Sequence, residues 1–537
     1  MKENLKISKN IYSNPNLFFS LVLIIYVFLG VYFLRYYKYD LISKDIISFV
    51  SVANLYASGN FSSAINGYWG PLFSWVLVPF ILLNSSPYFV LNMMKIISLV
   101  AGIFTIYGVR LLSYRFDMSE QIRNSILVAA IFMVLYFALR SSPVDLIFLC
   151  FLLYYLYYIF SPKYSLKPYY GVICGLIGAL AYFTKSYAFT FFPIHFVLFN
   201  IIHYLNGGNY RKTVLKNLIL GLTVFFIISG TWSFILSEKY GEITFGTSAK
   251  YNHAVIGPYS TGSHPTEYIN QGFMKPPYPG VTSAWYDPTF FTVKPWSPID
   301  SWYNFSFQLR KIRDNIRGLI GLYSSFSHLS FAIIFSYVLF LVRPFKELIS
   351  RRDLLFPLLT LLIFPLGYLP IALEIRYLWV VYVLLILMGG YLLNLLLKKG
   401  FFNRAQMSIL MVIFIFSFIL LPVSGLNSNK YTGEEYAELG RIINNEYHIK
   451  GNIASNGNAE NGYYRRTLHL SYFIGTSYYG FPKEGISDEE LEIELKKYGI
   501  NYYFVWGKTR NEVFLSRYKD VTDGKIEGLR IYSINFS

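Results

Sequence analysis

The chain has 537 residues, of which 54% are hydrophobic, 20% are aromatic and only 14% are charged. A soluble globular protein of this length does not need so much apolar surface, so the composition excludes that class and indicates a membrane protein. We assign the net charge of +17 to membrane topology and contact with anionic lipids, because no base-stacking motif is interleaved with the basic residues to indicate nucleic acid.

Apolar stretches of about 18 residues or more predict a polytopic α-helical membrane protein with about eleven transmembrane helices. With the N-terminus inside, every predicted inner loop is basic, whereas the short outer loops hold isolated cations. This positive-inside pattern predicts a multi-pass protein of the cytoplasmic (inner) membrane. The predicted spans lie near residues 17–34, 87–109, 125–139, 143–160, 169–184, 186–205, 214–236, 319–342, 354–373, 377–396 and 406–422.

The first outer loop, residues 35–86, carries two acidic residues, Asp40 and Asp45. Apolar residues follow Asp45 at a spacing that predicts a helix lying on the membrane surface, ended by Gly59. A carboxylate at this boundary can act as a base on a polar acceptor, or it can simply favour the helix N-terminus. The apolar stretch 71–83 is too short for a separate span, so we expect it to dip into the membrane as part of this loop.

The short outer turns contain further ionisable residues, which are costly at a membrane boundary and therefore need a reason. Arg140 and Asp145 flank one turn, and Asp145 is well placed to cap the following helix. Lys185 lies in the next outer turn, and Glu374 and Arg376 lie in a late apolar turn. Each cation can bind a phosphate, or it can mark the membrane edge or a local ion pair.

The large outer loop, residues 237–318, is rich in Pro, Gly, Trp and Tyr. His253, His264, Asp287 and Trp296 are its acceptor or loop candidates. The histidines lack metal-ligand spacing, so the metal is unknown and a divalent cation held by carboxylates is left open. The tryptophans suit either stacking on sugars or an interfacial belt. No phosphate-cradling glycine loop for a nucleotide is present.

The tail differs from the rest in pattern, with helices expected near 433–446 and 488–498 and strands near 452–455, 501–506 and 529–534. This alternation predicts a small C-terminal extracytoplasmic α/β domain. We therefore expect a transmembrane catalytic domain at 1–425 and the α/β domain at 426–537.

Three features resemble the glycosyltransferase-C superfamily, which includes the protein O-mannosyltransferases and the lipid A aminoarabinose transferases. They are a first-loop Asp before a helix ended by Gly (DIISFVSVANLYASGNF), short early outer loops, and a late RY-containing turn (EIRYLW). The stretches AINGYWGPLFSW, TKSYAFTFF, GTSAKYNHAVIGP and WYDPTFFTVKPWSP are also similar to a less characterised bacterial branch.

The resemblance implies that Asp45 is the catalytic base and that Lys185 and Arg376 bind the lipid phosphate. Glu374, Asp40, Asp145 and Arg140 would then be supporting residues. Many relatives have a paired acidic motif in the first loop, whereas Asp45 is flanked by Lys44 and Ile46.

The resulting hypothesis is an inverting glycosyltransferase with its active site on the outer face of the membrane. It would move a sugar from a polyprenyl-phosphate donor to a lipid, glycan or protein acceptor. One alternative is an oligosaccharide-unit polymerase or ligase, which would rely on outer-loop Arg and His residues. The other is a lipid-linked sugar transporter or flippase, which would have inverted repeats and charges at mid-membrane depth.

Overall fold

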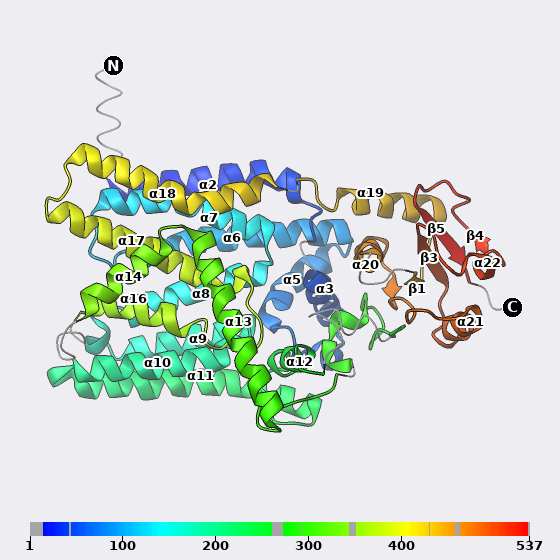
Figure 1. The fold of residues 1–537 in the computed structure, drawn as a ribbon, viewed down its shortest axis with the longest axis horizontal. Coiled ribbons are helices and arrows are strands. Elements are labelled where there is room, and N and C mark those ends of the chain that lie inside the picture. Colours follow the sequence, from blue (N-terminus) through cyan, green and yellow to red (C-terminus); the bar gives the residue numbers. More distant parts are fainter. Residues whose placement is uncertain are drawn as a thin grey trace, which may run out of the picture. The chain divides into compact units, whose positions relative to one another are not determined.

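The computed structural model describes residues 14–41, 44–259, 272–291, 293–342, 351–428, 430–456 and 462–534, and it is predominantly helical with one small sheet (Figure 1). The chain forms two compact units, each built from three segments. The membrane unit comprises Met1–Tyr36, Lys95–Phe245 and Ser306–Lys430. The sheet unit comprises Tyr37–Met94, Gly246–Phe305 and Tyr431–Ser537. The boundary at 425/426 between a catalytic and a C-terminal domain stays a prediction.

Helices make up most of the membrane unit, and the majority of them are apolar. They are α2 (Pro15–Tyr37), α6 (Pro87–Ser113), α7 (Glu120–Arg140), α8 (Pro143–Ile159), α9 (Tyr169–Thr184), α10 (Tyr187–Leu205), α11 (Arg211–Tyr240), α13 (Trp302–Phe326), α14 (Ser330–Leu341), α16 (Arg352–Ile363), α17 (Trp379–Lys398) and α18 (Arg404–Asn427). The helices of the sheet unit are α3 (Lys44–Ala57), α4 (Phe61–Ala64), α5 (Pro71–Leu83), α12 (Ser248–Val255), α19 (Glu434–Ile442), α20 (Tyr463–Ile474), α21 (Asp488–Lys497) and α22 (Glu512–Leu515).

The predicted fold class, a multi-pass helical membrane protein with a small C-terminal sheet region, is confirmed. Among the described residues, seven helices are long and apolar enough to cross a membrane, or up to eight if α13 and α14 form one bent span. The shorter helices α8 and α9 are also apolar. The count of about eleven spans stays a prediction. The predicted span 319–342 is interrupted, because α13 and α14 are bent by 105° at a short break.

Helices α9 and α11 pack closely through glycine. A Cβ added at Gly171 would lie 2.1 Å from the carbonyl oxygen of Asn217, and one at Gly175 would lie 2.2 Å from that of Gly221. Small residues permit this approach in membranes, where packing replaces the hydrophobic drive between helices. The Asn217 side chain also accepts a hydrogen bond from the Gly171 N–H at 2.9 Å. The contact fixes α9, whose C-terminal end carries Lys185.

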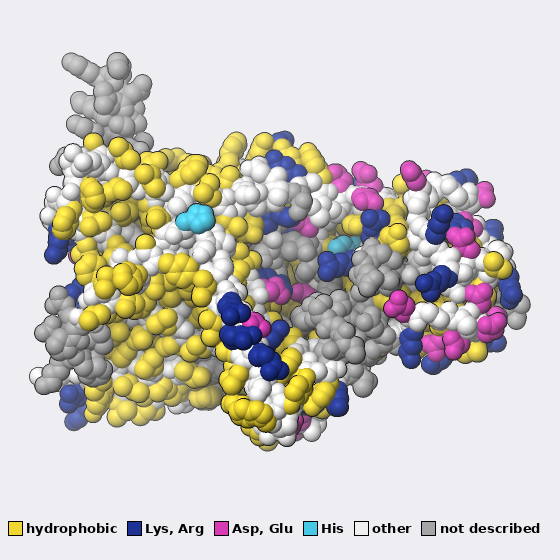
Figure 2. All heavy atoms as spheres, viewed as in Figure 1, with side chains coloured by type: hydrophobic (Ala, Val, Ile, Leu, Met, Phe, Trp, Pro, Cys, Tyr) yellow, Lys and Arg dark blue, Asp and Glu magenta, His cyan; other side chains and the backbone are white. Residues whose placement is uncertain are grey.

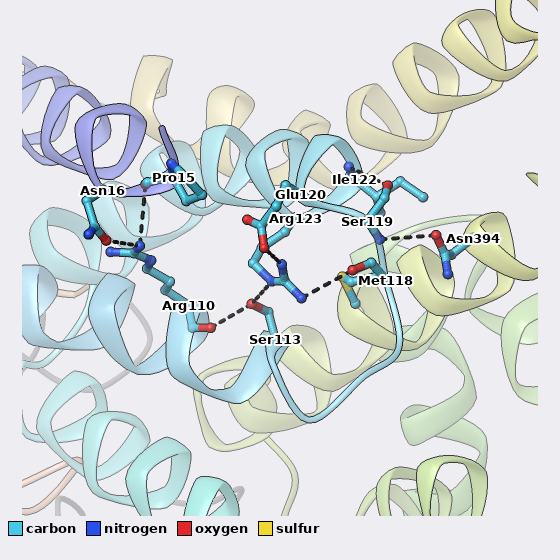
Figure 3. Close-up of polar contacts among 10 residues, drawn as sticks. All are labelled: Pro15, Asn16, Arg110, Ser113, Met118, Ser119, Glu120, Ile122, Arg123 and Asn394. Carbon is cyan, nitrogen blue, oxygen red and sulfur yellow. Dashed lines mark hydrogen bonds and ion pairs between the residues drawn. The ribbon is translucent and has the colours of Figure 1, made fainter. Parts of the chain in front are cut away.

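Two arginines of the predicted inner loops, Arg110 and Arg123, form hydrogen bonds with side chains of the protein itself (Figure 3). Arg110 on α6 donates to the Asn16 side chain in the first turn of α2 at 2.7 Å. The Nε of Arg123, on α7, donates to the Ser113 hydroxyl at 2.9 Å, and the same guanidinium pairs with Glu120. These contacts join the ends of α2, α6 and α7 through charge-assisted hydrogen bonds.

The described residues of the sheet unit form five strands in the order β2-β1-β3-β5-β4. They are β1 (Asn452–Ser455), β2 (Ser477–Tyr478), β3 (Tyr502–Trp506), β4 (Lys519–Asp520) and β5 (Leu529–Ser533). β2, β1 and β3 are parallel, whereas β3, β5 and β4 pair antiparallel. The three predicted strands and the helix α21 are confirmed within about a residue, whereas the predicted helix 433–446 consists of α19 followed by a π-helical turn, η7 (Ile443–Tyr447). Helices α20 and α22 and strands β2 and β4 were not predicted from the sequence.

The large loop covers the outer edge of this sheet. The N–H of Tyr478 donates to the Thr282 carbonyl at 2.7 Å, and the N–H of Met274 donates to the Tyr479 carbonyl at 2.8 Å. Ser283 also forms a parallel bridge with Tyr478. An exposed strand edge would otherwise present unpaired backbone groups. The loop residues 272–291 and the tail therefore fold as one structure.

Candidate active site

The candidate base lies on α3, whose predicted end at Gly59 is confirmed by a left-handed backbone (φ 79°). The periodicity predicted that α3 would bury only an apolar face. The structure differs, because polar residues of α3 are buried as well. The Ser48 hydroxyl donates to the Trp285 carbonyl at 3.0 Å, and Ser51 accepts from the Thr282 N–H at 3.3 Å. The large loop thus packs directly along α3.

Asp45 occupies the first turn of α3 and is partly buried. The indole N–H of Trp285 donates to Asp45 Oδ1 at 3.3 Å. Trp285 lies in a short 3-10 turn, η4 (Ala284–Tyr286), and is only 3% exposed. The indole has a single N–H and cannot accept a proton, so it orients the carboxylate without competing for its chemistry.

An aromatic pocket adjoins this pair, with Trp285 in its wall. Among the described residues, no charged side chain lines this small pocket. Phe291 comes from the loop, whereas Tyr464, Tyr478 and Phe481 come from the tail. Such a surface suits an uncharged, ring-containing group.

A second group of predicted residues meets in the membrane unit. Asp145, in the first turn of α8, lies between two cations: Lys185 Nζ is 2.5 Å from its Oδ1, and Arg376 Nη1 is 3.5 Å from its Oδ2. Arg376 Nε also pairs with Glu374 Oε2 at 2.5 Å. Lys185 comes from the turn between α9 and α10, and Arg376 from the 3-10 turn η6 (Ile375–Leu378). Asp145 lies where a cap was expected, but its carboxylate pairs with these cations.

The four charges differ in exposure. The Asp145 side chain is 2% exposed, those of Lys185 and Arg376 are 20% and 22% exposed, and that of Glu374 is 43% exposed. Burial lowers the pKa of Lys185, and the neighbouring Asp145 opposes this effect. Lys185 Nζ also lies 4.1 Å from the centroid of the Tyr377 ring. Asp145 is thus the buried counter-ion, and Glu374 is the solvent-facing one.

The loop candidates in the described part of the chain have structural contacts. The His253 ring stacks on Trp296, and the Trp296 N–H donates to the His253 carbonyl at 2.8 Å. Asp287 is fully buried and accepts from the N–H and hydroxyl of Thr289 at 3.1 and 2.6 Å. His264 lies outside the described residues. Within the described ranges, no group of three or more His, Cys, Asp or Glu residues is placed to hold a metal ion.

Two supporting candidates lie elsewhere. Asp40 is 3% exposed and lies near His469, whose pKa is lowered to about 4 chiefly by burial. Arg140 is the partly buried last residue of α7.

One residue with a clear contact, Lys95, was not predicted from the sequence, and Trp285 was named only among the tryptophans that could stack on sugars. Lys95 on α6 is 1% exposed and donates to the Leu139 carbonyl at 3.1 Å. A lone lysine inside an apolar span was a usable signal for it. The contact between Trp285 and Asp45 had no such signal, because 240 positions separate them.

The fold is similar to that of ArnT, a lipid A aminoarabinose transferase of the glycosyltransferase-C superfamily, and this is the fold that the sequence resemblance predicted. The crystal structure of ArnT from Cupriavidus metallidurans bound to undecaprenyl phosphate is similar, with a TM-score of 0.58 and 11% identity over 95% of this chain and 97% of that chain. The apo structure of ArnT aligns with a TM-score of 0.48 and 13% identity over 96% and 97%. No protein-family model and no curated protein matches the chain.

Proposed function

We propose that this protein is an integral-membrane glycosyltransferase that takes a sugar from a polyprenyl-phosphate donor. The observation that carries the proposal is the pair of cations, Lys185 and Arg376, around the buried Asp145. Such a pair suits a phosphate whose negative charge increases as the sugar leaves. The solved structure of ArnT contains undecaprenyl phosphate, which favours a polyprenyl phosphate as the lipid class.

The donor phosphate would bind at Arg376 by displacing Glu374. Glu374 is the more exposed carboxylate, so its removal from Arg376 leaves little buried charge uncompensated. Asp145 remains and keeps Lys185 and Arg376 oriented. The planar guanidinium then donates to two phosphate oxygens, and the lysine supplies a further positive charge.

Asp45 would act as the base. Its carboxylate takes the proton from an acceptor hydroxyl or amine while that group attacks the anomeric carbon. The bond between the anomeric carbon and the phosphate oxygen breaks, and its electron pair leaves with the polyprenyl phosphate. This single displacement inverts the anomeric centre. The Trp285 N–H holds the carboxylate, and the loop and tail shape the acceptor site.

The active site and the C-terminal domain would face outward from the cytoplasmic membrane. The basic inner loops support this orientation. The acceptor would be a lipid, glycan or protein, and membrane lipids surround the helices. The polymerase and transporter alternatives rank lower, because they give no specific role to a first-loop carboxylate with an indole partner.

The test is transfer from radiolabelled polyprenyl-phosphate sugars by the purified protein and by Asp45→Asn. We expect the substitution to lower transfer roughly 10²–10⁴-fold while the protein remains folded, because asparagine is also tolerated at a helix N-terminus. Asp488→Asn, which changes another first-turn acid in the sheet unit, is the matched control. Near-normal transfer by Asp45→Asn would overturn the assignment of the base.

A further inference from the structure

Helix α13 lies outside the candidate site and is held to the membrane unit along one face. The Asn315 side chain donates to the Leu369 carbonyl at 2.7 Å, and Gln308 donates to the Pro370 carbonyl at 2.9 Å. Near its end, the Tyr323 hydroxyl donates to the Leu361 carbonyl at 3.2 Å. These contacts fix the rotation of α13 about its axis and determine which residues point away.

An apolar stripe runs along the exposed side of α13. Leu309, Ile316 and Ile320 are 50%, 43% and 51% exposed. Their spacing of seven and four residues places them on one side of a helix. Exposed leucine and isoleucine in such a stripe favour a lipid environment over water.

A basic stripe runs beside the apolar one. At 3.6 residues per turn, Arg310, Arg313 and Arg317 fall within roughly 100° of the apolar stripe. The Arg313 and Arg317 side chains are 56% and 72% exposed. Asp314 lies 3.1 Å from Arg313 and 3.9 Å from Arg317, so it balances only part of this charge. Figure 2 shows Lys and Arg side chains gathered over α13.

The direction of α13 also distinguishes it from a spanning helix. It meets the apolar helix α14 at a bend of 105°. A helix that lies in the headgroup layer and then turns into the bilayer has this geometry. The basic stripe falls in the segment predicted as an outer loop, where the positive-inside rule gives no reason for clustered cations.

We propose that α13 lies in the membrane interface and that Arg310, Arg313 and Arg317 bind the phosphates of anionic phospholipids. The apolar stripe enters the acyl region, and the neighbouring guanidinium groups reach the headgroups above it. Arginine suits this role because its fork donates to two phosphate oxygens at once. The proposal is independent of the transfer reaction.

The experiment compares lipid selectivity in nanodiscs containing the full-length protein. Energy transfer from the protein's tryptophans to pyrene-labelled phosphatidylglycerol, in competition with unlabelled phosphatidylcholine, reports the preference for the anionic lipid. The test variant is Arg310→Gln/Arg313→Gln/Arg317→Gln. The control, Lys496→Gln/Lys508→Gln/Lys519→Gln, removes the same charge from exposed positions of the sheet unit.

We expect the α13 variant to lose phosphatidylglycerol preference by at least about fivefold, the effect of one basic residue near an anionic surface, and the control to stay near wild type. Arg310→Lys/Arg313→Lys/Arg317→Lys keeps the charge and should retain most of the preference. Wild-type selectivity in the glutamine variant, equal loss in the control, or complete loss in the lysine variant would each overturn the proposal. Unchanged thermal unfolding in phosphatidylcholine nanodiscs shows that the variants are folded.

Discussion

The two candidate groups, one in each unit, differ in how they hold their carboxylates. In the membrane unit, Asp145 is fixed by two cations that lie in apolar turns. In the sheet unit, Asp45 is fixed by a neutral indole. Charged groups in apolar surroundings are costly, so their presence in a sequence requires an explanation. A neutral donor has no such cost, so it gives no comparable signal in a sequence. The large loop contains several tryptophans, and nothing in the sequence distinguishes Trp285 from the others.

We expect the largest effect when Asp145, the counter-ion shared by Lys185 and Arg376, is lost. Asp145→Asn leaves Lys185 and Arg376 facing one another, and we expect it to lower the free energy of unfolding by about 3–5 kcal/mol. Undecaprenyl phosphate should then raise the melting temperature of the variant more than that of the wild type, because the phosphate replaces the missing charge. Equal shifts in melting temperature in both proteins would mean that the phosphate does not bind at Lys185 and Arg376.

Removal of one cation should affect transfer more than folding. We expect Arg376→Ala to reduce transfer roughly 10²–10³-fold, the usual cost of removing a group that stabilises developing charge. Arg376→Lys keeps the charge but loses the planar fork, so partial activity should remain. Donor kinetics should change more than acceptor kinetics. If Arg376→Ala only lowered the melting temperature, Arg376 would be a structural ion-pair partner. Lys185 would then be the leading candidate for the phosphate ligand.

The Asp45 group, held by a neutral indole, should respond more mildly to loss of its partner. Trp285→Phe keeps an aromatic ring but removes the N–H that Asp45 accepts, and we expect kcat to fall roughly 10–100-fold, the worth of a hydrogen bond to a charged group. Donor KM should stay close to that of the wild type. Trp296→Phe is the matched control, since its indole N–H donates to a backbone carbonyl in the same loop. Equal losses in both variants would mean that the loop had simply been disturbed.

The smallest expected effect is on the pH dependence of folding stability, and it concerns only the sheet unit. The pKa of His469 is lowered to about 4, chiefly by burial, with Asp40 raising it and Arg465 lowering it. The unfolded chain binds this proton near pH 6.5, so stability is complete above that value and is lost as pH falls from about 6.5 to 4. The expected slope is about 1.4 kcal/mol per pH unit. Chemical denaturation of wild type and His469→Gln should differ in this slope. Parallel curves would contradict the prediction.

Local patterns predicted those elements that carry their own signals. Helix α3 with its end at Gly59 and strands β1, β3 and β5 follow from periodicity and turn residues. Strands β2 and β4 have two residues each, which is too short for any alternation. The bend after Phe326 was missed because hydropathy continues through it and does not report direction.

The two candidate groups differ in the same way. Lys185, Asp145, Arg376 and Glu374 were each noticed from sequence, and the structure brings them together. Their proposed phosphate-binding role stays a prediction. The link from Asp45 to Trp285 arises only after the loop has paired with the tail, and no local pattern reports a contact across 240 positions.

The pairing of the large loop with the tail also has a consequence for biosynthesis. The Ser477 hydroxyl donates to the Val281 carbonyl, and 196 positions separate the two residues. At roughly 5–20 residues per second, the ribosome needs about 10–40 s to make the intervening chain. During that interval the segment that carries Trp285 has no β2 to pair with, although Asp45 has already been synthesised. A nascent chain released before Tyr478 would therefore carry the carboxylate without the strand that completes its surroundings.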